Sequence, residues 1–276
     1  MMTQTRMNIN VDMGESFGSY SFGSDAELIE LVPTANVACG FHAGDPHVMR
    51  ETVAMALEHG VEIGAHVGLP DLIGFGRRWL EVSADELHDY TLFQIGALDA
   101  FVRAAGGQMT HVKPHGVLYR ACGERADYAE ALVQAVASVD PGLHLIVGGD
   151  VAIEAGRRRG VRATNEGYVD LEYRGDGYPV IEQRKLPKDP EDVAERAVRL
   201  ATAQRARVKG TGGELTVDVP TLCLHGDTPN ADEIARAVRA ALADAEVGVV
   251  GLAEAMDWSE AAHAAPDLSK TTSTAD

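Results

Sequence analysis

Nine ionisable side chains follow short apolar stretches of this sequence. They are carboxylates, imidazoles and one lysine: Asp12, Glu15, His42, Asp45, His66, Lys113, His115, His225 and Asp227. Carboxylates beside a lysine and several histidines suit acid–base chemistry at a carbonyl group, because a carboxylate activates water while lysine or histidine stabilises oxyanion charge. Mutual proximity also moves carboxyl pKa values apart, which separates one acid from one base. The pattern therefore predicts an acid–base site, provided that the fold brings these side chains together.

Each of these residues also has a purely structural interpretation. A single histidine after a strand often serves only as a hydrogen-bonded structural residue. Asp45 precedes Pro46 and would cap a helix that begins there. Lys113 would form a structural ion pair with Asp12 or Glu15. The recurrence of ionisable groups at several strand ends favours a site over these separate interpretations.

A metal site is an alternative use of the same residues. One carboxylate and two imidazoles, Asp12, His42 and His66, would hold a divalent metal with open coordination positions and so suit metal-assisted hydrolysis. The local spacing adds no support, since the sequence has no HExxH motif. A proline between His111 and His115 also disfavours the helix that would present both rings on one face. The metal hypothesis therefore depends on the fold.

Nucleophilic catalysis and direct nucleotide binding find little support. Cys39 and Cys223 lie inside apolar stretches, where inert buried thiols are expected. The sequence has no GxxxxGK[ST] phosphate-binding loop, and the glycine-rich segment 210–214 lacks the lysine and the strand–helix context of such a loop. We interpret that segment as a turn, and we expect no ATP site from this chain alone.

Short apolar strands alternate with amphipathic helices along the chain. The predicted strands are Met7–Asp12, Thr34–Cys39, Glu62–His66, Met109–Lys113, Leu143–Val147, Val161–Thr164 and Pro220–His225. The predicted helices are Asp25–Leu31, Pro46–His59, Ser83–Ala105, Arg125–Val139, Val151–Arg158, Pro190–Ala203 and Asn230–Ala243. Seven β/α units indicate a parallel sheet with right-handed crossovers. Polar residues after almost every strand favour a barrel over an open doubly wound sheet, and a barrel collects all strand exits on one face.

We expect one β/α barrel domain over residues 1–252. An inserted loop region near 166–188 contains glycine and tyrosine and lacks helical periodicity. A loop of that length in a compact domain is usually functional or forms a hairpin of its own. Residues 253–276 become rich in Ala, Ser and Thr, and we expect a flexible C-terminal tail there.

Composition narrows the class of protein. Of the 276 residues 45% are hydrophobic, as in globular proteins, and the net charge of −18 argues against nucleic acid as a partner. No apolar run approaches the roughly 20 residues that span a bilayer, and no secretory signal is visible. Three widely spaced cysteines predict no disulfide framework, so we expect a cytoplasmic protein. The acidic, lysine-poor composition fits either adaptation to high salt or coding bias.

Six segments in combination resemble the LamB/YcsF family, and the resemblance runs from about Met7 to Val250. The segments are Asn10–Glu15, Ala35–Asp45, Ile63–His66, Gly74–Arg77, His111–Gly116 and Cys223–Asp227. The resemblance implies an α/β fold, namely an irregular seven-stranded β/α barrel similar to polysaccharide deacetylases. It also implies ATP-dependent opening of the 5-oxoproline lactam to L-glutamate. That reaction would take place in a complex with PxpB-like and PxpC-like subunits, with ATP as a co-substrate of the complex.

Roles for individual residues follow as expectations. Expected catalytic residues are Asp12, Glu15, Lys113, His115, His225 and Asp227. Expected substrate-binding residues are His42, Asp45, His66, Arg77, Glu166 and Asp170. Asp12 or Glu15 would activate water, and Lys113 with a histidine would stabilise the oxyanion. Two alternatives stay open: a stand-alone metal-dependent amidohydrolase or deacetylase, and a non-catalytic regulatory subunit that binds a small carboxylate.

One region departs from the family pattern. Leu171 and Glu182 stand where the family pattern has arginines. If those arginines bind the carboxylate of the substrate, this chain acts on another lactam or amide, unless Arg174 or Arg184 compensates.

Overall fold

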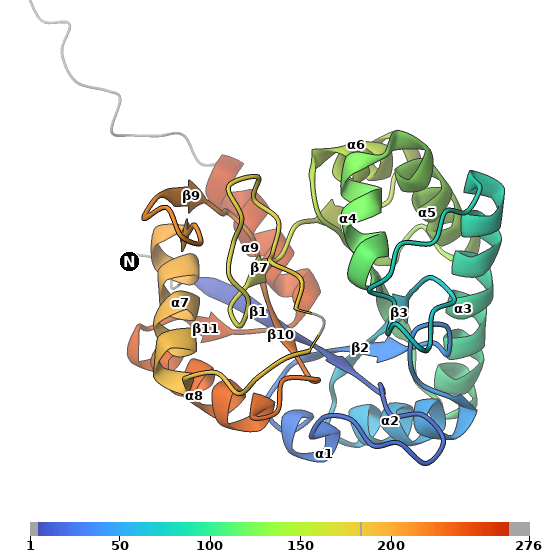
Figure 1. Ribbon diagram of the computed structural model, residues 1–276, viewed down its shortest axis with the longest axis horizontal. Helices are drawn as coiled ribbons and strands as arrows, with labels where there is room; N and C mark the ends of the chain where they lie inside the picture. The colour runs from blue at the N-terminus through green and yellow to red at the C-terminus, as the bar shows by residue number, and fades with distance from the viewer. Residues whose placement is uncertain (1–4, 183, 265–276) are drawn as a thin grey trace, which may run out of the picture.

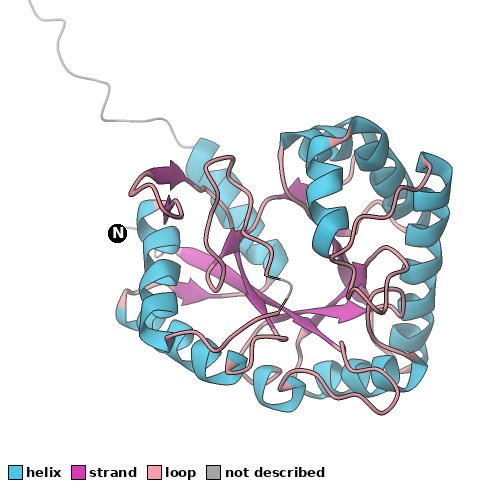
Figure 2. Ribbon diagram, in the orientation of Figure 1, coloured by secondary structure: helices cyan, strands magenta, loops and turns pink. Residues whose placement is uncertain are grey.

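The computed structural model describes residues 5–182 and 184–264, and a parallel sheet lies at its centre (Figure 2). Its strands are β1 (Arg6–Met13), β2 (Thr34–Ala38), β3 (Glu62–Val67), β4 (Met109–Pro114), β5 (His144–Ile146), β6 (Ala163–Thr164), β7 (Gly167–Tyr168), β10 (Thr221–His225) and β11 (Gly248–Val249). Neighbours run in the order β6-β5-β4-β3-β2-β1-β10-β7, and β11 pairs with the start of β1. The central strands are buried along nearly their whole length, as expected when helices cover a parallel sheet.

Helices surround this sheet (Figure 1). They are α1 (Asp25–Leu28), α2 (Pro46–Glu58), α3 (Ala84–Ala104), α4 (Gly116–Glu124), α5 (Ala126–Val139), α6 (Asp150–Arg159), α7 (Pro190–Ala203), α8 (Ala231–Asp244) and α9 (Leu252–Ala264). α3 starts with a capping box between Ser83 and Glu86, at the place where the predicted helix begins. Within the described ranges, no helix combines the length and the apolar character needed to cross a bilayer.

The sheet curls into an almost closed barrel with one open seam. β6 and β7 form its two edges, yet only Asn165 and Glu166 separate them in the chain. Three Cα–Cα steps of extended chain span at most about 11 Å, so the two edges lie close together. Among residues 5–182 and 184–264 no backbone pairing joins these edges, because parallel neighbours need a much longer connection.

The predicted α/β class and curled parallel sheet are confirmed, but the strand count is not seven. All seven predicted strands form, with ends shifted by no more than two residues. β7 adds an eighth strand around the curl, and β11 adds a ninth beside β1. Both new strands have only two residues, which is too short for an alternation pattern to reveal them. α4 was also missed, because it follows β4 almost without a loop.

The inserted loop region forms a small structure of its own. Tyr173 makes an antiparallel bridge to Pro179 and a parallel bridge to Val208. The second bridge connects the insert to a hairpin of β8 (Arg205–Arg207) and β9 (Glu214–Thr216). The glycine-rich segment 210–214 lies at the tip of this hairpin, in agreement with the predicted turn.

The expected flexible tail is wrong for residues 253–264, which belong to α9. Leu252 and Met256 are buried and pack with Ile146 of β5 in a small apolar cluster. Arg6 of β1 also donates a hydrogen bond to Glu254 at 2.6 Å. The alanine-rich composition is therefore that of a helix which packs on the barrel. Residues 265–276 of the predicted tail lie outside the described residues.

Candidate active site

Strand register brings the predicted residues to one end of the barrel. Asp12 of β1 is in register with Asn36 of β2 and His225 of β10. His66 of β3 is in register with Lys113 of β4. Since all these strands are parallel, the side chains at their carboxyl ends converge on one face, as the barrel interpretation expected.

Lys113 is buried at the centre of this face. Its Nζ lies 3.0 Å from Asp12 Oδ1, 3.1 Å from Glu166 Oε2, 3.0 Å from Asn10 Oδ1 and 3.1 Å from Cys223 Sγ. Burial lowers the pKa of Lys113, but the neighbouring Asp12, Cys223 and Glu166 outweigh it and hold the pKa well above its usual range. The lysine is therefore a fixed positive charge between two buried carboxylates.

Asp12 is held ionised by its neighbours. Burial raises its pKa, but His66 and Lys113 outweigh burial and hold the pKa well below its usual range. Oδ1 accepts hydrogen bonds from Lys113 and Asn36. Oδ2 lies 3.4 Å from His66 Nε2 and 4.0 Å from His225 Nε2. One oxygen is thus anchored, while the other faces two imidazoles.

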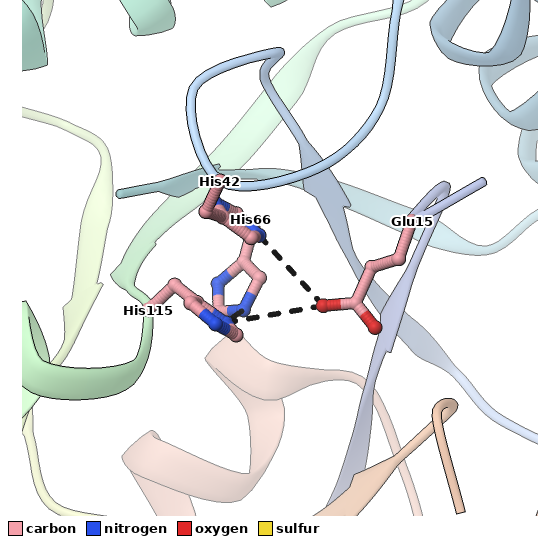
Figure 3. Close-up of side chains that lie close together, drawn as sticks. All are labelled: Glu15, His42, His66 and His115. Carbon is pink, nitrogen blue, oxygen red and sulfur yellow. Dashed lines mark hydrogen bonds and ion pairs between the residues drawn. The ribbon is translucent and has the colours of Figure 1, made fainter. Parts of the chain in front are cut away.

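Glu15 and three histidines form a second buried group beside Asp12 (Figure 3). Glu15 Oε1 lies 3.7 Å from His42 Nε2 and 3.9 Å from His115 Nδ1. His115 Nδ1 lies 2.9 Å from His66 Nε2, and the rings of His42 and His115 stack with centroids 3.9 Å apart. The predicted metal set of Asp12, His42 and His66 is therefore grouped differently, with Glu15 and His115 beside the two histidines.

Burial also sets the protonation of this group. It raises the pKa of Glu15 well above its usual range, and the carboxylates of Asp227 and Asp12 add to the effect. Burial lowers the pKa of His42 and of His115 well below the usual value, with further contributions from neighbouring imidazoles. His42 and His115 are therefore neutral imidazoles at neutral pH.

A third group contains Lys185, which sequence reasoning missed. This buried lysine lies 2.8 Å from Asp227 Oδ1 and 3.5 Å from Asp170 Oδ2. Arg77 donates to Asp227 Oδ2 at 2.7 Å, and Asp170 Oδ1 lies 2.8 Å from His225 Nδ1. Lys185 belongs to the aperiodic insert, so only the rarity of lysine in this sequence could have indicated it.

Asp45 does not join these groups. Its Oδ1 accepts hydrogen bonds from the N–H groups of His47 and Val48 at the start of α2, and its Oδ2 accepts one from Gly18. These contacts are those of a helix cap, as the capping interpretation of Asp45 expected.

A serine pattern that sequence reasoning overlooked also lies near the site. Residues 14–18 read GxSxG, the pattern of a nucleophile elbow. Ser16 Oγ accepts a hydrogen bond from the N–H of Phe22 at 3.0 Å, and no helix follows directly. The serine therefore stabilises a loop and lacks the strand–turn–helix context of such an elbow.

A cavity of about 580 Å³ opens above these groups. Glu15, His42, Arg77, Lys185 and Asp227 line its inner part. Aromatic and aliphatic side chains line its outer part, namely Phe17, Tyr20, Phe22, Leu72, Ile73 and Phe75. A smaller cavity of about 60 Å³ shares Arg77 and Lys185 and reaches Asp12, Lys113 and Glu166. A small polar compound therefore has access to the carboxylates of Glu15 and Asp12.

Comparison with known proteins shows the family to which this chain belongs. A model of the LamB/YcsF family matches residues 7–257. The chain belongs to the LamB/YcsF family. One relative, the A subunit of 5-oxoprolinase from Nocardia farcinica, is 47% identical over 245 residues, which cover 88% of this chain and 98% of that protein. The protein of the same name from Bacillus cereus is 44% identical over 239 residues, covering 85% and 94%. The crystal structure of a lactam utilization protein from Thermus thermophilus matches with a TM-score of 0.80 at 42% identity, covering 88% and 98%.

Membership of the LamB/YcsF family confirms the resemblance seen in the sequence.

The two positions that depart from the family pattern have different surroundings. Leu171 is buried and lines the smaller cavity. Both oxygens of Glu182 accept hydrogen bonds from Lys188, at 2.6 and 2.7 Å. Arg174 pairs with Asp176 at 3.0 Å, whereas Arg184 lines the larger cavity. Of these two arginines, Arg184 is the one that lines a cavity of the candidate site.

Proposed function

We propose that this chain is one component of an ATP-dependent 5-oxoprolinase, which opens the lactam of 5-oxoproline to L-glutamate. Relatives named as the A component of 5-oxoprolinase cover 85–88% of the chain at 43–47% identity. The observation that carries the proposal is the buried Lys113, fixed between Asp12 and Glu166 where the smaller cavity ends. An inert barrel would not gain stability from three charges in its interior.

The chemistry has to overcome the low reactivity of a lactam. In the proposed sequence, ATP transfers its γ-phosphoryl group to the amide oxygen, which weakens the amide resonance. Water then adds to the activated carbon as a base takes its proton, and the carbon–nitrogen bond breaks, which leaves an acyl phosphate. A second water hydrolyses this acyl phosphate to the side-chain carboxylate of glutamate and inorganic phosphate. The ring nitrogen takes a proton and becomes the amino group of glutamate.

Asp12 fits the role of base, and His225 fits the role of acid. Asp12 Oδ2 is not used by Lys113 or Asn36, and Asp12 lines the smaller cavity. His225 keeps 15% of its side-chain surface exposed, and its Nδ1 donates to Asp170 Oδ1, which orients the ring. Nε2 of His225 is then free to move a proton to or from the ring nitrogen of the lactam. Lys113 supplies fixed positive charge for the oxyanion.

Arg184 fits the carboxylate of 5-oxoproline. Arg77 and Lys185 also line the larger cavity, but both already neutralise Asp227. For Arg184 no ion pair forms with the described residues, so its guanidinium is available for a bidentate contact with a ligand carboxylate. This role would replace that of the arginines absent at positions 171 and 182.

The proposed reaction needs a binding site for ATP, and we expect partner subunits to provide it wholly or in part. The sequence has no P-loop, so the nucleotide is expected to be bound by PxpB-like and PxpC-like subunits or shared with them. The relatives carry the name of one component of an enzyme, which supports an assembly of several chains.

The test is glutamate formation from 5-oxoproline and ATP, with this chain alone and with its two candidate partner subunits. We expect turnover only in the full complex, and loss of at least about 100-fold in kcat for Asp12→Asn and His225→Gln. His47→Gln on the exposed start of α2 is the matched control and keeps full activity. Arg184→Ala raises KM for 5-oxoproline, while Arg174→Ala leaves KM unchanged. Full activity of Asp12→Asn would refute the assignment of the base, and lactam binding without turnover in the full complex would favour a regulatory role.

A stand-alone metal-dependent amidohydrolase is the second candidate. The buried group of Glu15, His42, His66 and His115 is the observation that favours it. Amide hydrolysis by the isolated chain without ATP would support this candidate over the first.

A further inference from the structure

The group of Glu15, His42, His66 and His115 presents four ligand atoms to one point (Figure 3). These atoms all lie within 4.8 Å of one another, and all four residues are at least nine-tenths buried. They come from the loops after β1, β2 and β4 and from β3 itself. Four chain segments therefore converge on a place where the described residues leave polar atoms without partners.

The outer contacts of two histidines fix which of their nitrogens carry hydrogen. His66 Nδ1 lies 3.0 Å from the carbonyl oxygen of Lys113, and His115 Nε2 lies 2.8 Å from the carbonyl oxygen of Phe75. A carbonyl oxygen only accepts, so both of these nitrogens are donors. His66 Nε2 and His115 Nδ1 are left as lone pairs, and they face each other at 2.9 Å. Two such lone pairs repel unless a cation lies beside both.

A proton is the simplest cation, but it does not satisfy the whole group. A proton on His66 Nε2 would bond to His115 Nδ1 and approach Asp12 Oδ2 at 3.4 Å. It would leave Glu15 Oε1 and both ring nitrogens of His42 without a hydrogen-bond partner, as they are among the described residues. Buried polar atoms without a partner cost free energy, so they call for a ligand that bonds to Glu15 Oε1 and to one ring nitrogen of His42.

We propose that Glu15, His42, His66 and His115 bind one first-row transition-metal ion of the zinc type. Three imidazoles and one carboxylate are ligands that zinc prefers, whereas magnesium and calcium prefer oxygen. Bonds of about 2.0–2.1 Å in a tetrahedron place ligand atoms about 3.3–3.4 Å apart. The distances of 2.9, 3.7 and 3.9 Å in this group bracket that value.

The surroundings hold the ligands in place. The two carbonyl contacts orient His66 and His115, which is the usual outer support of a metal-binding histidine. Two glycines leave room for the stacked rings: a Cβ at Gly68 would lie 2.5 Å from His42 Nδ1, and one at Gly76 would lie 2.6 Å from His115 Cδ2. Glu15 and His42 also line the larger cavity, so an ion has a path from solvent. When bound, it would supply Lewis-acid polarisation of an amide oxygen.

Metal binding is testable without substrate, so failure of the proposed function would leave this inference intact. The full chain is stripped with a chelator, reloaded with Zn²⁺ or Co²⁺, and assayed for bound metal by elemental analysis and for Co²⁺ absorption. We expect one ion per chain, intense visible bands of tetrahedral Co²⁺, and a thermal midpoint that rises on loading. His42→Ala and the nearly isosteric Glu15→Gln should each weaken affinity by at least about 10–100-fold.

The control is His47→Ala, which removes an exposed imidazole that also has a glutamate neighbour, Glu51. It should bind the metal as the unaltered chain does. Substoichiometric binding after reloading, or the same affinity in Glu15→Gln and His47→Ala, would overturn the proposal. In that case a strongly deshielded proton resonance between His66 and His115 would identify a shared proton as the cation.

Discussion

Replacing Lys113 by methionine should upset the balance of charge at the centre of the barrel. Its Nζ lies about 3 Å from Asp12 and Glu166, both buried. Each pair gains roughly 5 kcal/mol of Coulomb energy at an effective dielectric constant of about 20, and desolvation of the charges opposes most of that gain. Methionine fills a similar volume but leaves two carboxylates without a cation. We expect the free energy of unfolding to fall by about 3–5 kcal/mol.

A second substitution makes this prediction specific. In the unaltered chain, Glu166→Gln removes one partner of Lys113 and should cost about 1–3 kcal/mol. In the Lys113→Met background the same change removes an unpaired buried charge, so it should stabilise the fold by a similar amount. The sign of the Glu166→Gln effect thus reverses between the two backgrounds.

Urea unfolding at pH 8, followed by circular dichroism, measures all four proteins of this cycle. Lys209→Met is the matched control, because Lys209 forms an exposed ion pair with Glu172 and should contribute less than about 1 kcal/mol. A cost below about 1 kcal/mol for Lys113→Met would refute the reasoning. So would destabilisation by Glu166→Gln in both backgrounds.

Three further predictions concern the scaffold. Burial raises the pKa of Asp25 to about 6, so its contribution to stability is present at low pH and is lost as pH rises through 6. Asp25→Asn keeps an acceptor for the N–H of Gly14 but does not titrate. Between pH 5 and 8 the free energy of unfolding should therefore fall by about 1.4 kcal/mol less in this variant than in the unaltered chain, as measured by urea unfolding at both pH values. A Cβ at Gly64 would collide with the ring of His111, so Gly64→Ala should cost about 1–3 kcal/mol, and an unchanged thermal midpoint would contradict the close approach. Leu252→Ala should cost about 2–5 kcal/mol if α9 packs on the barrel, whereas a loss below about 0.5 kcal/mol would mean that this helix contributes little.

Local sequence patterns predicted the strand exits well. The buried strands are short and mostly apolar, and Asp12, His66 and Lys113 stand at or near the ends of three of them. Parallel pairing then forces residues such as Asp12, His66 and Lys113 to one face, whatever the details of the loops. The convergence of these three was therefore predictable from the order of the elements alone.

Pairwise contacts within the site were not predictable in the same way. Asp45 and Glu15 both follow a strand, yet one caps a helix and the other enters a buried group of histidines. The difference depends on loop conformations that local propensity does not determine. Lys185 shows the same limit, because its partners Asp170 and Asp227 belong to distant segments.

The seam between β6 and β7 has a consequence for how this architecture diversifies. No ladder hydrogen bonds cross it within residues 5–182 and 184–264, and Glu166, which stands in the seam, links the two sides by its contacts with Lys113 and Asn10. The part of the insert beyond Val169 follows the edge strand β7, so changes in its length break no backbone pairing of the sheet. New ligand-binding loops can therefore be exchanged at this one junction while Asp12, Lys113 and Glu166 are kept, and the charges of Asp170 and Lys185 change with the loop.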